Sequence, residues 1–207
     1  FLIPIVKSYG SDRGFDVCNT ALMVYGGYGY CREYPAEQYL RDVKISAIYE
    51  GTNGVQALDL LGRKMKLKGG QLFKSFYQWI SDFVKTNEAN PAIAAGVARL
   101  KDSLNTLRAC TDTLGKALGE GNAAYAQLHA TPFLNTCGDI LSAFLLLRSA
   151  SIADKKLKGT GVSAVDQTFY QNKIKTAEFF AHQILPQVNA RLISLQSGDS
   201  SGLEITH

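Results

Sequence analysis

Several patterns that would assign a chain to a particular class are missing from this 207-residue sequence. The four cysteines form no CxxC pair and match no zinc spacing, and the three histidines are isolated, so no metal site is predicted. Cysteines without a pairing pattern are typical of a reduced, intracellular compartment. No stretch approaches the roughly 18 continuous apolar residues of a membrane span, so we expect none.

The sequence also carries little excess charge. Its net charge is +4, and the longest basic cluster, Arg63-Lys64 with Lys66 and Lys68, lies at a predicted helix end. Cations at that position complement the helix dipole. A nucleic-acid-binding chain usually gathers its Lys and Arg residues on one face, so no nucleic-acid partner is expected.

What the sequence does contain is helical periodicity, and no segment alternates as a strand would. With 46% hydrophobic and 19% charged residues, the chain can build a core, and we predict an all-α fold. Residues 1–25 predict a helix that breaks near Gly10, where Ser11-Asp12 would cap a second piece. Gly26-Gly27 would end it. Further helices are expected at about 37–48, 53–66 and 70–86.

The second half predicts a bundle of four helices. In the segment that opens at Asn90-Pro91, apolar or small residues alternate at spacings of four and three, which is typical of a bundle seam. These positions are Ile93, Val97, Leu100, Leu104, Leu107, Thr111, Leu114 and Leu118. A helix over 123–155 should be broken or kinked at Pro132, and a last helix over 165–196 should be disturbed at Pro186.

The best domain boundary lies at Lys68-Gly69-Gly70, where glycines end a helix. The predicted units are 1–68, 69–196 and a flexible tail, 197–207. The second unit shows no paired carboxylates in an apolar context, and its Asp139 and Asp154 are expected to face solvent. Packing or assembly is therefore its expected role.

A cluster of three glycines, Gly26, Gly27 and Gly29, marks a turn where the backbone can approach another body closely. The glycines either only turn the chain between two helices, or they admit a phosphate or a cofactor. A glycine cluster by itself does not decide between the two.

Glu50 is the best candidate for acid–base chemistry. It follows Ile48 and Tyr49 and precedes a new helix capped by Thr52 or Asn53. A carboxylate between apolar residues at a turn can be partly desolvated, which raises its pKa toward working pH and suits a general base. An ordinary exposed glutamate at a turn is the alternative.

Four motifs of the first 66 residues together resemble the C-terminal helical domain of flavin-dependent acyl-CoA dehydrogenases. They are Gly26-Gly27-Tyr28-Gly29-Tyr30, Glu33-Tyr34-Pro35, Tyr39-Leu40-Arg41-Asp42 and Ile48-Tyr49-Glu50-Gly51-Thr52. The continuation is similar to a subgroup with an extra helical C-terminal region, to which the 3-methylmercaptopropionyl-CoA dehydrogenase type belongs. It comprises Asn53-Gly54, Gln56-Ala57-Leu58-Asp59, Gly62-Arg63-Lys64 and, less specifically, Phe169-Tyr170 through Leu185-Pro186-Gln187.

The resemblance implies that Glu50 removes the α-proton of an acyl-CoA while the β-hydride passes to FAD, which gives a 2-enoyl-CoA. It places Gly51 and Tyr49 at the substrate. It places Thr52, Asn53 and Gly54 near the FAD, and Gly26 and Gly27 at the FAD of a neighbouring subunit, so a homo-oligomer, a dimer or tetramer, is expected. Many relatives carry Gln where this chain has Met23, and another carries Gln at Gly54.

The family has an N-terminal helical domain and a middle β-domain ahead of this region, and neither is found in the 207 residues. We therefore expect the C-terminal part of an enzyme that alone neither holds FAD tightly nor turns over substrate. An electron acceptor such as electron-transfer flavoprotein is the expected partner, and the bacterial cytoplasm or the mitochondrial matrix the expected location. The alternatives are a non-catalytic oligomerisation module and an acyl-CoA oxidase.

Overall fold

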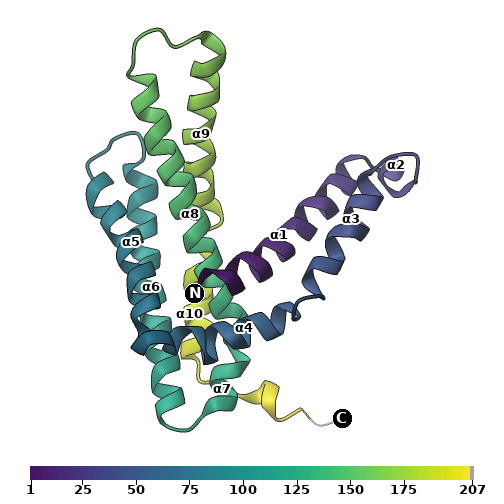
Figure 1. Cartoon of the computed structure of the whole chain (residues 1–207), viewed down its shortest axis with the longest axis vertical. Coiled ribbons are helices and arrows are strands. Elements are labelled where there is room, and N and C mark those ends of the chain that lie inside the picture. Colours follow the sequence, from purple (N-terminus) through teal and green to yellow (C-terminus); the bar gives the residue numbers. More distant parts are fainter. Residues whose placement is uncertain (206–207) are drawn as a thin grey trace.

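The computed structural model describes residues 1–205, and within them every regular element is a helix, as the periodicity predicted. An arm projects from an upright helical bundle (Figure 1). The arm, which we define as residues 2–47, consists of α1 (Leu2–Val24), α2 (Gly27–Tyr30), α3 (Ala36–Lys44) and the 3-10 helix η1 (Ile45–Ala47). Helix α1 leads away from the bundle, α3 returns alongside it, and α4 (Asn53–Gly62) re-enters the base of the bundle (Figure 1).

The bundle is built from α5 (Gln71–Asn87), α6 (Ala94–Gly119), α8 (Ala130–Leu157) and α9 (Ala164–Gln183). Three shorter elements join or extend these helices: η2 (Lys64–Gly70), α7 (Ala123–Leu128) and α10 (Gln187–Gln196). Helix α8 is central, since α1, α4, α5, α6, α9 and α10 all contact it. The predicted seam is confirmed in α6, because its apolar side chains at 97, 100, 104, 107 and 114 are buried.

Helix α8 is long and apolar enough, by length and composition, to cross a membrane. Most of its apolar stretch is buried, at 67%, inside the bundle. Its position in the core therefore accounts for its composition.

Helix α1 runs without a break through Gly10, so the predicted break is wrong. The hydroxyl of Ser11 donates to the Ser8 carbonyl inside the helix (3.0 Å), and Asp12 accepts a hydrogen bond from Asn53 at the start of α4 (2.7 Å). These side chains hold α4 against α1 instead of capping a new helix. A glycine costs only about 1 kcal/mol in a helix, which packing against several neighbours exceeds.

The predicted break at Pro132 is also misplaced. The chain breaks at His129, between α7 and α8, and Pro132 lies in the first turn of α8. A proline is tolerated there because the first N–H groups of a helix have no intrahelical partner. Pro186 does separate α9 from α10, as predicted.

Asp139 and Asp154 do not face solvent, which corrects the sequence prediction: their exposed fractions are 2% and 7%. Asp139 accepts hydrogen bonds from the Tyr9 hydroxyl (2.7 Å) and the Arg191 guanidinium (2.5 Å). Asp154 pairs with Lys158 one turn later (2.7 Å). Because α8 is surrounded by other helices, even its carboxylates are buried, and partners compensate them.

The division at residue 68 stays a prediction. At that point Lys68, Gly69 and Gly70 all have positive φ and turn the chain from α4 into α5. The predicted units pack on each other, because α1 and α4 contact α8. In the predicted tail the 3-10 helix η3 (Ser201–Leu203) contacts α7, and residues 206–207 lie outside the described part of the chain.

Candidate functional site

Glu50 lies on a strained turn between η1 and α4. Its φ is +56° and that of Gly51 is +81°, so two successive residues are in the left-handed region. Glycine adopts this conformation freely, whereas a residue with a side chain pays roughly 1 kcal/mol or more. The turn is held by two side chains: Gln56 donates to the Glu50 carbonyl (2.9 Å) and Lys7 donates to the Gly51 carbonyl (2.7 Å).

Helix α4 begins at this turn with the predicted cap. The Thr52 hydroxyl accepts a hydrogen bond from the Val55 N–H (3.4 Å), and Thr52 and Gly54 are both exposed. The first N–H groups of a helix have no partner within it, and with the helix dipole they favour an anion. The start of α4 therefore offers hydrogen-bond donors to a phosphate.

Asn53 has a different role from its neighbours Thr52 and Gly54, because its side chain forms hydrogen bonds with residues of α1. Its Nδ2 donates to Asp12 Oδ1 (2.7 Å) and to the Ser8 carbonyl (3.3 Å). Its Oδ1 accepts from Lys7 Nζ (2.9 Å), and the Ser11 hydroxyl lies within 3.2 Å. These bonds fix the start of α4 on α1, so Asn53 can offer a cofactor only its backbone.

The Glu50 side chain is exposed, and so are Ile48 and Tyr49, at 53% and 50%. The desolvation expected from these apolar neighbours is therefore not supplied by this chain, which corrects the prediction. Glu50 and Tyr49 line an open hollow of about 310 Å³ together with Lys7 and Ser11 of α1. The carboxylate is thus presented at the surface, beside a small cavity that another body can cover.

The glycine turn lies at the free end of the arm. Gly26 has a φ of +62°, and a Cβ on Gly29 would lie 2.4 Å from the Leu22 carbonyl, so the fold itself requires both glycines. Gly27 begins α2 with an ordinary φ and open space around it, so the fold gives no reason for a glycine there.

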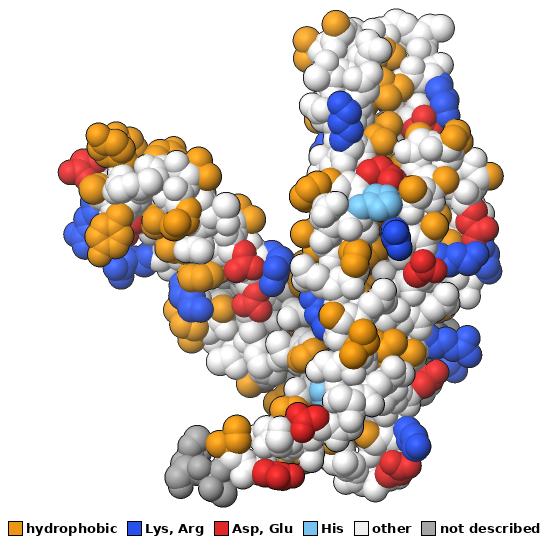
Figure 2. Space-filling view, turned by 180° about the vertical axis from the view of Figure 1, so that it is seen from behind, with side chains coloured by type: hydrophobic (Ala, Val, Ile, Leu, Met, Phe, Trp, Pro, Cys, Tyr) orange, Lys and Arg blue, Asp and Glu red, His pale blue; other side chains and the backbone are white. Residues whose placement is uncertain are grey.

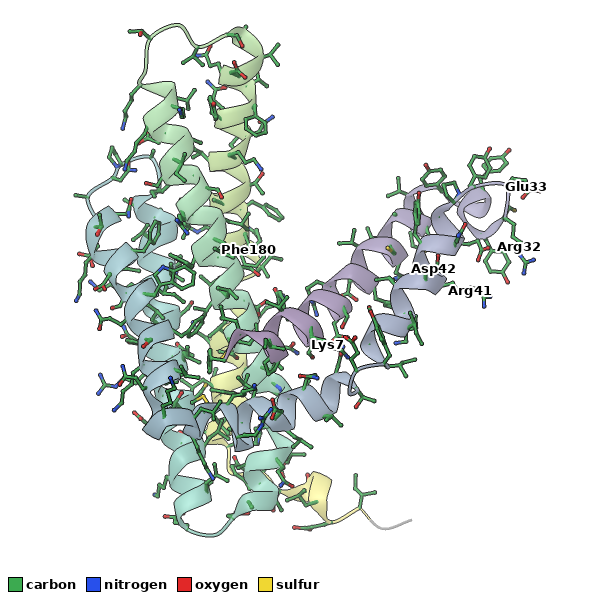
Figure 3. The ribbon with its side chains drawn as sticks, in the orientation of Figure 1. Lys7, Arg32, Glu33, Arg41, Asp42 and Phe180 are labelled. Atoms are coloured by element: carbon green, nitrogen blue, oxygen red, sulfur yellow. The ribbon has the colours of Figure 1, made fainter. Side chains whose placement is uncertain are left out.

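The two groups of predicted site residues are not brought together within one chain. Arg32 and Glu33 mark the free end of the arm, and Lys7 lies near its base, beside the segment that leads into α4 (Figure 3). Arg41 and Asp42 lie between these ends, exposed on α3, and neither enters an ion pair with any of residues 1–205. The glycine turn and the Glu50 turn therefore do not form a single site within this chain.

Sequence reasoning missed Lys7, Ser8, Ser11 and Asp12 as partners of the α4 start. The signal was present: Lys7 and Ser11, and Ser8 and Asp12, are each four residues apart and so share one face of a helix. Reading Ser11-Asp12 as a helix cap concealed that polar face.

Both parts of the chain match family models. The arm and α4 match "Acyl-CoA dehydrogenase, C-terminal domain" over residues 2–65. The bundle matches "Acetyl-CoA dehydrogenase C-terminal like" over residues 76–206. The chain therefore belongs to the acyl-CoA dehydrogenase family, as its motifs indicated.

Individual relatives agree with this assignment. A butyryl-CoA dehydrogenase of Syntrophomonas wolfei is 33% identical over 203 residues, which cover 98% of this chain and 33% of that protein. The 3-methylmercaptopropionyl-CoA dehydrogenase of Ruegeria pomeroyi is 34% identical, over 97% of this chain and 34% of that protein. This chain thus spans about a third of the length of these curated relatives.

A solved structure has the same fold. The crystal structure of an acyl-CoA dehydrogenase complexed with FAD from Bacillus anthracis superposes with a TM-score of 0.67, over 97% of this chain and 34% of that one. The two sequences are 19% identical. The predicted all-α class is confirmed.

Proposed function

We propose that this chain is the C-terminal part of a flavin-dependent acyl-CoA dehydrogenase, in which Glu50 removes the α-proton of the acyl thioester. The observation that carries this proposal is the exposed Glu50 carboxylate on a strained turn, directly ahead of the open start of α4. Strained residues held by surrounding contacts are typical of functional sites.

The chemistry requires a base and a hydride acceptor. Glu50 takes the α-proton onto its carboxylate, and FAD, when bound, accepts the β-hydride, so that a 2-enoyl-CoA is formed. Gly51 and Tyr49 adjoin the carboxylate and meet the substrate. In the assembled enzyme a cover over the exposed Ile48 and Tyr49 would exclude water from Glu50.

The residues at the start of α4 fit a phosphate-bearing cofactor such as FAD. Thr52 and Gly54 are exposed there and offer a hydroxyl and backbone N–H groups. Asn53 contributes its backbone only, since its side chain is bonded to α1. Gly26 and Gly27 stand at the start of α2, which lies at the far end of the arm (Figure 1), so their contact is with the FAD of a neighbouring subunit.

The free end of the arm supports a homo-oligomer. Hydrophobic side chains gather there (Figure 2), among them Val24, Tyr28 and Tyr30 with exposed fractions of 81%, 68% and 82%. Exposed apolar patches of this kind mark interaction sites. Acyl-CoA and an electron acceptor such as electron-transfer flavoprotein are the other proposed partners.

Replacing Glu50 tests the proposal. In the full-length enzyme that carries this chain, Glu50→Gln should lower turnover of acyl-CoA by about 10²–10⁴-fold, the usual contribution of a general base, with FAD retained. Glu120→Gln, an exposed glutamate at the end of α6, is the matched control and should be neutral. Unchanged turnover in Glu50→Gln would favour a non-catalytic module, and rapid consumption of oxygen by the wild type would favour an oxidase.

The 207-residue chain alone is proposed to be inactive, because among residues 1–205 Glu50 lies beside an open hollow and not in an enclosed site for a flavin or thioester. Recombinant chain should purify colourless and leave an electron acceptor unreduced when acyl-CoA is added. A yellow preparation that reduces the acceptor would contradict this.

The bundle is proposed to support subunit contacts or the outer wall of the acyl pocket, since it carries large apolar side chains that this chain leaves exposed. Its helix α9 exposes Phe179 at 62%. Phe179→Glu in the full-length enzyme should weaken the oligomer, measured by light scattering, whereas Thr86→Glu, at an exposed position of α5, is the control. An unchanged oligomer in Phe179→Glu would argue against this contact.

A further inference from the structure

Lys7 of α1 reaches across to the Glu50 turn. Its ammonium group donates to the Gly51 carbonyl (2.7 Å) and to Asn53 Oδ1 (2.9 Å). The side chain is half-buried, and among residues 1–205 it forms no ion pair within 4 Å. A lysine loses up to about 2 kcal/mol of side-chain entropy when it is fixed, so two short hydrogen bonds to neutral oxygens indicate a specific role.

The two bonds of Lys7 differ in what they hold. The bond to Asn53 adds to an anchor that already exists, because Asp12 and the Ser8 carbonyl also bind the Asn53 amide. The bond to Gly51 holds the turn itself. It fixes the peptide plane that directly follows Glu50 and Gly51, the two left-handed residues.

The other carbonyl of the turn, that of Glu50, is held by a different side chain. Gln56 of α4 donates to the Glu50 carbonyl (2.9 Å), so successive carbonyls of the turn are bound by side chains from two different helices. Lys7 and Glu50 also line the same hollow of about 310 Å³. Of the two donors, Gln56 belongs to α4, whereas Lys7 belongs to α1. Lys7 therefore fixes the position of the turn relative to the arm.

We propose that Lys7 is a positioning residue, which fixes the Gly51 carbonyl and thereby holds Glu50 in the orientation that presents its carboxylate to the substrate. The proposal rests on the proposed function of Glu50. A misplacement of reacting groups by about 1 Å can cost 10²-fold in rate. Loss of the Lys7 bond therefore acts on the chemical step more than on substrate binding.

Lys7→Met in the full-length enzyme with FAD bound keeps the aliphatic stem and removes the donors. Flavin reduction by acyl-CoA in a single turnover should slow by about 10²-fold while KM and FAD content change little. Lys7→Arg restores a donor and should recover much of the rate. Lys74→Met, an exposed lysine on α5, is the matched control. If Lys7→Met does not fold, Lys7→Ala, which also removes both donors and suits a helix, serves in the same comparison.

Asp12→Asn separates positioning from anchoring, because it weakens the Asn53 anchor without touching the Gly51 carbonyl. We expect Asp12→Asn to lower the melting temperature with little change in the rate of flavin reduction. Equal losses of rate in Asp12→Asn and Lys7→Met, or a wild-type rate in Lys7→Met, would overturn the role of Lys7. A wild-type rate in Glu50→Gln would instead overturn the proposed function.

Discussion

Asp139 should be the residue whose loss most weakens the attachment of the arm to the bundle. Its carboxylate is buried in α8 and joins Tyr9 of α1 to Arg191 of α10. The Tyr9 ring also packs directly on Gly138, where a Cβ would lie 2.3 Å from the ring. Burial and the hydrogen bond to Asp139 raise the pKa of Tyr9, so its hydroxyl remains a donor at neutral pH.

Asp139→Ala leaves the Arg191 guanidinium without its anion and the Tyr9 hydroxyl without its acceptor. Breaking a buried ion pair costs about 3–5 kcal/mol, and we expect the lower end because the Arg191 side chain is 22% exposed and can be partly hydrated. Tyr9→Phe keeps the ring on Gly138 and removes one hydrogen bond to a charged group, so it should cost about 1.5–3 kcal/mol.

Urea unfolding of the 207-residue chain, followed by circular dichroism, measures these free energies. Asp154→Ala is the control within the same helix, since its partner Lys158 has a side chain that is 64% exposed and loses little when left alone. It should cost less than Asp139→Ala. A loss below about 0.5 kcal/mol for Asp139→Ala, the range of ordinary surface changes, would refute the reasoning.

Three further predictions concern single side chains. Burial lowers the pKa of His129, whose Nε2 has no hydrogen-bond partner among residues 1–205, so the unfolded chain binds a proton at a higher pH than the folded chain does. Stability should therefore fall as the pH drops below about 6.5, and His129→Gln should flatten that dependence. Gly10→Ala should raise the free energy of unfolding by about 1 kcal/mol, because α1 is continuous and the Cβ meets no atom within 4 Å, and an unchanged or lower melting temperature would contradict this. A thiol reagent should label exposed Cys31 rapidly. Burial raises the pKa of Cys110 to about 11 and also raises that of Cys137, so both should react only after unfolding; early labelling of either, detected by mass spectrometry, would contradict their burial.

Local sequence patterns predicted those features of the helices that depend on residues close together in the sequence. The cap at Thr52, the seam of α6 and the interruption at Pro186 each depend on a few neighbouring residues. The break at Gly10 was wrong because contacts with α3, α4 and α8 override a weak local preference.

The site itself depends on distant residues and was harder to predict. Lys7 and Asn53 are 46 positions apart, and Tyr9 and Asp139 are 130 apart, so no local pattern reveals either pair. Ile48 and Tyr49 are apolar, yet they do not bury Glu50, because both side chains are themselves exposed to solvent. Apolar neighbours in the sequence shield a carboxylate from water only when other parts of a protein pack over them. The motifs around Glu50 nevertheless identified the family.

A single turnover of the flavin in the full-length enzyme tests most directly whether Glu50 is the base. Acyl-CoA is mixed anaerobically with enzyme carrying equal amounts of FAD, and the loss of flavin absorbance is followed in the wild type, Glu50→Asp and Glu50→Gln. We predict that Glu50→Gln slows this step by about 10²–10⁴-fold. Glu50→Asp keeps a carboxylate on a shorter side chain, so its rate should lie between those of the wild type and Glu50→Gln. Bleaching at the wild-type rate in Glu50→Gln would contradict the assignment of Glu50 as the base.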